Sequence, residues 1–62
     1  MFDYLFEFTE DSEMAGEQFL VECSSLTEAW DILEKHGFLV DDVQVIERMS
    51  VHQGELLGLD TY

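Results

Sequence analysis

The chain has 62 residues, with fifteen Asp or Glu against two Lys or Arg, which gives a net charge of -13 at pH 7. This length allows one hydrophobic core, so we expect residues 1–62 to form a single domain. Two cations cannot build a phosphate-neutralising surface, which excludes direct nucleic-acid binding, and an anionic membrane would repel the chain too. Apolar residues make up 47% of the sequence and proline is absent, which favours a packed fold over disorder.

The first 23 residues predict a β-hairpin. Aromatic residues share one face of the first strand: Phe2, Tyr4, Phe6 and Phe8. This alternation is typical of a half-buried strand. Residues 9–16 are polar and end in a glycine, which is typical of a loop. Alternation then resumes, with Phe19, Val21 and Cys23 on one side, so the second strand should pair antiparallel with the first.

A helix should follow. Ser25 and Glu28 have the spacing of a capping box, in which each side chain binds a backbone N–H at the start of the helix. Apolar residues then recur at helical spacing: Leu26, Ala29, Trp30 and Leu33. Gly37 supplies the left-handed residue that ends helices, and Phe38 can fold back onto the last turn.

The C-terminal third predicts a strand and a short helix. Residues 43–49 are rich in β-branched side chains, with Val43 and Val45 facing one way and Ile46 and Arg48 the other. Ser50 and Gln53 form a second possible capping box, and Gly58 a second possible stop.

The element order β-β-α-β(-α) limits the topology. A right-handed crossover through the helix makes the second and third strands parallel, with room for the first strand between them. The fold class is therefore expected to be α+β, with a three-stranded, antiparallel-type sheet of order 2-1-3. One helix should cover the aromatic face, with Phe6 and Trp30 among the most buried side chains.

No residue pattern points to catalysis, a cofactor or a metal. Cys23 falls on the apolar face, where a thiol stays protonated and inert. His36 and His52 lack the spacing that brings metal ligands together. A lone cysteine and the absence of a basic, apolar leader after Met1 favour a cytoplasmic protein. We therefore expect a non-enzymatic protein.

The distribution of charge is the informative feature. Residues 1–34 carry ten acids and no Lys or Arg. Neighbouring carboxylates lie about 6.6 Å apart along one strand face and about 5–6 Å apart on a helix, which resembles the spacing of phosphates along a nucleic-acid strand. Such an array can bind a basic groove. The plainer interpretation is that the acids only keep a small protein soluble. The candidate partner-binding residues are Glu10, Asp11, Glu13, Met14, Glu17, Glu28, Asp31 and Glu34.

In size, charge and element order the chain resembles the small acidic inhibitor proteins of phages and mobile elements, including DNA-mimic anti-restriction and anti-CRISPR proteins. The resemblance covers the whole chain and involves no motif. It implies a binding protein that occupies the basic channel of a host nuclease, CRISPR effector or similar nucleic-acid-binding protein. Met14, Phe38 and Tyr62 are the hydrophobic anchors expected beside the acids.

A second hypothesis is a regulatory or structural module that self-associates. Leu5, Leu20 and Ile46 form an apolar strip on the sheet face away from the helix. Leucines of the tail could cover this strip within one chain, or a homodimer could bury it by stacking two sheets.

Overall fold

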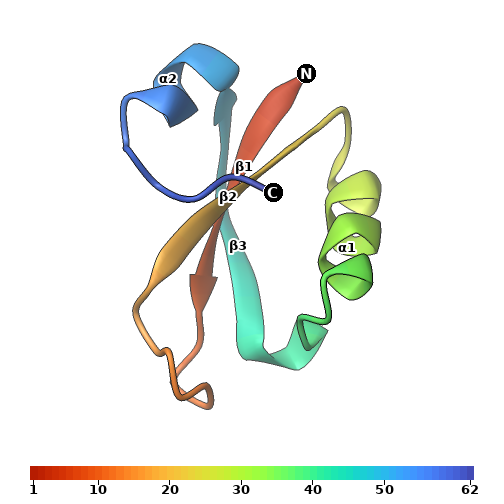
Figure 1. Cartoon of the computed structure of the whole chain (residues 1–62), viewed down its shortest axis with the longest axis vertical. Helices are drawn as coiled ribbons and strands as arrows, with labels where there is room; N and C mark the ends of the chain where they lie inside the picture. Colours follow the sequence, from red (N-terminus) through yellow and green to blue (C-terminus); the bar gives the residue numbers. More distant parts are fainter.

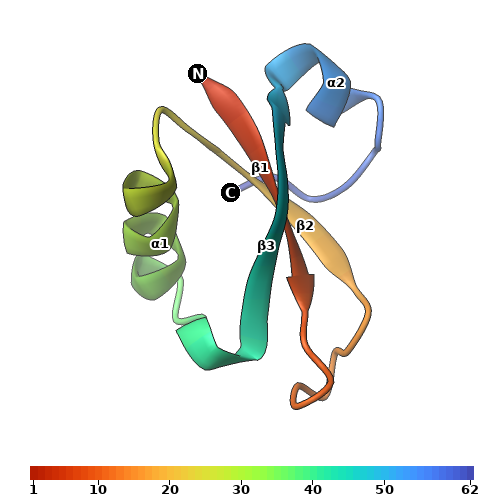
Figure 2. The ribbon, with the colours of Figure 1, turned by 180° about the vertical axis from the view of Figure 1, so that it is seen from behind.

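The computed structural model describes residues 1–62 and has the predicted α+β architecture (Figure 1). Its elements are β1 (Phe2–Phe8), β2 (Gln18–Cys23), α1 (Leu26–Lys35), the 3-10 turn η1 (Val40–Asp42), β3 (Val43–Ser50) and α2 (Val51–Glu55). The sheet order is β2-β1-β3, and β1 pairs antiparallel with both neighbours. Views from the front and from behind place α1 on one side of the sheet and α2 on the other (Figures 1 and 2).

The core lies between α1 and the aromatic face of the sheet. Its buried members are Tyr4, Phe6, Phe19, Val21, Cys23, Ala29, Leu33 and Val43. Phe6 is fully buried, as predicted, and stacks on Phe19 with ring centroids 5.5 Å apart. Trp30 is only half-buried, so that expectation was wrong. The indole lies at the edge of the helix and sheet interface, where it meets the Phe6 ring edge to face at 5.1 Å.

The ends of α1 follow the predicted signals with one difference. The Ser25 hydroxyl accepts a hydrogen bond from the Glu28 N–H (3.2 Å). The Glu28 carboxylate does not complete the capping box, because it accepts from the Ser24 hydroxyl instead (2.7 Å). At the other end Gly37 has a φ of 83°, and the Phe38 N–H donates to the Leu33 carbonyl (3.0 Å), which turns Phe38 back toward the core.

The predicted direction of one side chain in β3, that of Arg48, was wrong. The register shifts between Leu5 and Phe6, because Phe6 lies opposite Val45 while Leu5 lies opposite Glu47. Ile46 is the extra residue of this bulge, and the residues after it exchange faces. Arg48 therefore lies opposite Tyr4 on the α1 side of the sheet, and its guanidinium sits 4.6 Å from the centre of the Phe2 ring.

The sheet face away from α1 is covered by other parts of the same chain. Leu5 and Leu20 are buried, and Ile46 is the only member of the predicted strip that is exposed. Helix α2 packs against β1 and β3, and its start has the complete predicted capping box between Ser50 and Gln53. Leu56 and Leu57 point to solvent, so these two leucines do not provide the cover.

The last three residues protect the outer edge of β2. The Leu20 N–H donates to the Asp60 carbonyl (2.8 Å), the Tyr62 N–H to the Leu20 carbonyl (2.8 Å), and the Glu22 N–H to the Tyr62 carbonyl (3.0 Å). The Tyr62 ring packs against Phe19 and Phe38 at 5.5 and 5.2 Å. The sequence predicted only an anchor role for Tyr62, whereas in the structure these three residues close both a sheet edge and one end of the core.

Candidate functional site: an acidic groove beside the hairpin loop

Most carboxylates reach solvent, as a charged surface requires. Each predicted binding residue is exposed: Glu10, Asp11, Glu13, Met14, Glu17, Glu28, Asp31 and Glu34. Two of the ten acids before Lys35 do not belong to this surface. Asp3 is buried, and Glu7 is half-buried near the end of the central strand β1, where it accepts hydrogen bonds from the side chains of Gln18 (3.3 Å) and Gln44 (3.5 Å).

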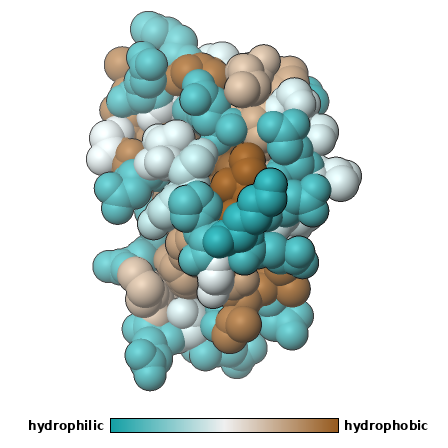
Figure 3. Space-filling model, turned by 45° about the vertical axis from the view of Figure 1, so that its right-hand side comes forward, coloured by the Kyte–Doolittle hydropathy of each residue, from teal (hydrophilic) through white to brown (hydrophobic).

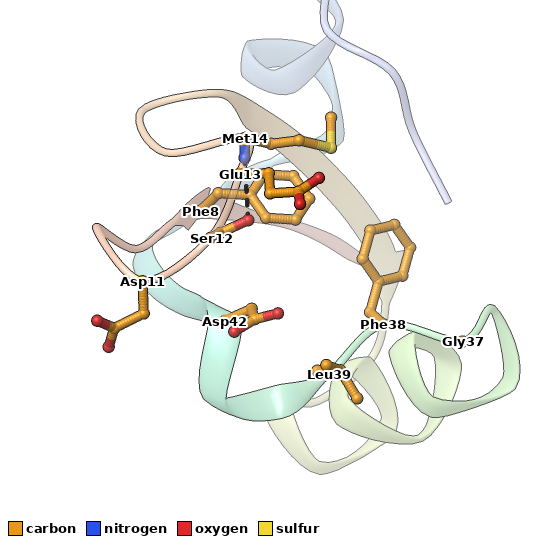
Figure 4. Close-up of a pocket in the computed structure, with 9 residues that line it drawn as sticks. All are labelled: Phe8, Asp11, Ser12, Glu13, Met14, Gly37, Phe38, Leu39 and Asp42. Atoms are coloured by element: carbon orange, nitrogen blue, oxygen red, sulfur yellow. Dashed lines mark hydrogen bonds between the residues drawn. The ribbon is translucent and has the colours of Figure 1, made fainter.

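A groove separates the β1–β2 loop from the segment that joins α1 to β3. Its volume is about 430 Å³. Its lining residues are Phe8, Asp11, Ser12, Glu13, Met14, Gly37, Phe38, Leu39 and Asp42. Figure 4 shows the Phe8 and Phe38 rings beside the Glu13 and Asp42 side chains, while the Asp11 carboxylate points outward. The groove thus combines an aromatic wall with an acidic rim.

Backbone hydrogen bonds hold the two walls of this groove together. The Thr9 N–H donates to the Asp42 carbonyl (2.8 Å), which ties the start of the loop to the start of β3. Within the loop the Gly16 N–H donates to the Phe8 carbonyl (3.1 Å), and the Met14 N–H donates to the Ser12 hydroxyl (3.1 Å). These bonds fix the backbone that carries the groove.

The structure brings together only some of the predicted residues. Asp11, Glu13 and Met14 line the groove. Glu17 instead borders a second, more polar hollow beside Gly58 and Asp60. The other four predicted residues border neither cavity: Glu10, Glu28, Asp31 and Glu34.

Sequence reasoning missed Leu39 and Asp42, which complete the groove. Asp42 belongs to the acidic corner after Phe38, but nothing in the sequence shows that this corner meets the hairpin loop. Phe38, a predicted anchor, is half-buried, and its outer part lines the groove. Met14 is 49% exposed, and Tyr62 is 38% exposed although its ring also packs against Phe19.

The two cations of the chain leave the groove unneutralised. Lys35 is at the last turn of α1 and Arg48 is over the Phe2 ring, and neither lines the groove. Over the face that α1 presents in Figure 3, hydrophilic side chains predominate and the hydrophobic patches between them are small.

Two titratable groups are buried away from this surface. Burial raises the pKa of the Cys23 thiol, which is fully buried and lies 3.2 Å from the Ser25 carbonyl oxygen. Burial also raises the pKa of Asp3, and repulsion from Glu22 and Glu55 adds to this effect. Cys23 is thus a core residue, as its place in the strand pattern predicted.

Comparisons with protein-family models, with curated proteins and with solved structures found no match. The structure contains no group of three or more His, Cys, Asp or Glu side chains placed to hold a metal ion. None of its helices has the length and apolar character needed to cross a membrane.

Proposed function

We propose that this chain is a non-enzymatic acidic binding protein that occupies the basic nucleic-acid-binding groove of another protein. The partner would be a nuclease, a CRISPR effector or a similar host protein, and the chain would act as a phage-type inhibitor. The place of action would be the cytoplasm, since Cys23 is a free thiol and a lone cysteine suits a reducing compartment.

The observation that carries this proposal is the exposed acidic surface of the first half of the chain. Eight of the acids before Lys35 are exposed, and that stretch contains no Lys or Arg. A small domain stays soluble with a net charge of about 2–8, so a charge of -13 exceeds that need. Surplus charge of one sign destabilises a compact fold by self-repulsion, which makes a binding role the better explanation.

The proposal predicts which proteins the chain captures. Immobilised protein should retain nucleic-acid-binding proteins from a host lysate at about 50 mM salt and release them near 200 mM salt or on addition of duplex DNA. The variant E10K/D11K/E13K should retain much less, since loop residues tolerate substitution and the core is untouched. The proposal would be refuted if the captured proteins stay bound in the presence of duplex DNA and near 200 mM salt, and if E10K/D11K/E13K captures them as well as the wild type does.

The self-association hypothesis is tested by a substitution at Ile46. Leu5 and Leu20 are buried, so Asp at either position would unfold the protein rather than probe a surface. Ile46 is 48% exposed, and Ile46→Asp leaves the loop acids intact. A dimer in solution that Ile46→Asp dissociates would favour the self-associating module.

A further inference from the structure

The groove between the hairpin loop and the α1–β3 connection has the features of a site for one cationic side chain. Its volume of about 430 Å³ is at the lower end of the range of about 300–1,000 Å³ typical of ligand pockets. The Phe8 and Phe38 rings lie with their centroids 6.0 Å apart along one wall. Met14 and Leu39 add exposed apolar surface at the rim. These contacts suit an extended aliphatic stem.

The charged side chains of the groove are all acidic. Glu13 and Asp42 flank the aromatic wall in Figure 4, and Asp11 stands outside them. No lysine, arginine or histidine lines the groove. A partner group that enters must therefore supply the positive charge itself.

Arginine fits the aromatic wall and the acidic rim of the groove better than lysine does. A guanidinium stacks on aromatic rings and donates forked hydrogen bonds to carboxylates, whereas an ammonium is a compact, strongly hydrated point charge. The chain already contains one such contact, since the Arg48 guanidinium lies 4.6 Å from the centre of the Phe2 ring.

We propose that this groove is the anchor site for an arginine side chain of the basic partner, with the stem against Phe38 and Met14 and the guanidinium between Glu13 and Asp42. This inference rests on the proposed function and locates its most specific contact. The remaining exposed acids then contribute long-range attraction without a fixed geometry.

The test is a titration of the full chain with blocked tetra-arginine and tetra-lysine peptides at about 50 mM salt, followed by backbone NMR. The wild type should bind tetra-arginine about tenfold more tightly than tetra-lysine, with the largest shifts at residues 11–14 and 37–42, since one additional charge-assisted hydrogen bond is worth about this factor. E13Q/D42N should lose most of this preference. D31N/E34Q is the matched control, because it removes the same charge from exposed positions outside the groove.

Phe38→Leu separates the aromatic contribution from charge and should weaken tetra-arginine binding more than tetra-lysine binding. Circular dichroism must show the fold intact, since Phe38 also stacks on Phe19. The anchor site would be overturned if E13Q/D42N and D31N/E34Q weaken peptide binding equally and the wild type shows no preference for tetra-arginine. The proposed charge-based function would still stand in that case. A wild type that binds neither peptide would overturn both.

Discussion

At the scale of single residues, Asp3 is the most unusual group in the molecule. It is 2% exposed, and its Oδ1 has no hydrogen-bond partner. No cation compensates for its burial, because the charged groups that act on it, Glu22 on β2 and Glu55 on α2, are both acidic. A buried, unpaired carboxylate costs free energy when it is ionised.

The free energy of unfolding should therefore rise as pH falls from 7 toward about 4. The pKa of Asp3 is raised in the folded state, so the folded protein binds more protons than the unfolded chain over this interval, and protonation favours folding. Asp3→Asn removes the buried charge, so it should stabilise the protein at pH 7 and flatten the pH profile. Urea unfolding at several pH values measures both effects.

Asp31→Asn provides the control for this prediction, since it is the same chemical change at an exposed position. Its effect on stability should stay within about 0.5 kcal/mol at every pH. Profiles that change equally in the two variants would show that Asp3 has no special role.

Gly54 is a residue whose identity the fold requires. A Cβ at this position would lie 2.6 Å from Cγ and 2.8 Å from Cβ of Asp3, so α2 can approach β1 only because residue 54 has no side chain. Gly54→Ala should destabilise the protein by about 1–3 kcal/mol, the usual cost of overpacking. In a helix that did not pack on the sheet, the same substitution would be stabilising by up to about 1 kcal/mol. The sign of the change in a urea titration therefore decides whether α2 docks on β1.

At the scale of elements, local signals account for much of the fold. Ser25 and Gly37 mark the ends of α1, and the aromatic alternation of β1 identifies the face that the helix covers. The bulge at Ile46 could not be predicted, since it depends on how β3 pairs with β1 and no glycine or proline marks it. The loop half of the candidate site was predictable from its charge, but Asp42 joins it only through the tertiary fold.

The pairing of residues 60–62 with β2 could not be predicted for a related reason. Residues 60–62 have no periodicity, and their structure consists of three backbone hydrogen bonds to β2 and the packing of one ring. Deleting them should lower the free energy of unfolding by about 2 kcal/mol, since each backbone hydrogen bond contributes about 0.5–1.5 kcal/mol and the aromatic contacts add to this.

Hydrogen exchange gives a local measurement of the same loss. The amides of Leu20 and Glu22 should exchange much faster after the deletion, because their acceptors are the carbonyls of Asp60 and Tyr62. Thr61→Ala is the control, since it retains all three backbone bonds. Unchanged exchange at Leu20 and Glu22 in the deleted protein would mean that the tail does not pair with β2.

At the scale of the whole molecule, charge and size act together. Thirteen net negative charges share a body of 30 × 21 × 16 Å, and carboxylates that are neighbours on a strand or helix face lie closer together than the Debye length of about 8 Å at physiological salt. The carboxylates therefore repel one another in the folded state, and their summed field extends into solvent toward any basic surface. The same field that weakens the fold would accelerate association with a cationic partner.

The most direct test of the account is the salt dependence of binding to a purified partner from the capture experiment, measured with duplex DNA as competitor. If the acidic surface takes the place of nucleic acid, affinity should fall steeply between about 50 and 200 mM salt, and DNA should displace the protein competitively. E10K/D11K/E13K should weaken binding and reduce the salt slope. Affinity that is flat in salt, with DNA and this protein bound to the partner at the same time, would contradict the account.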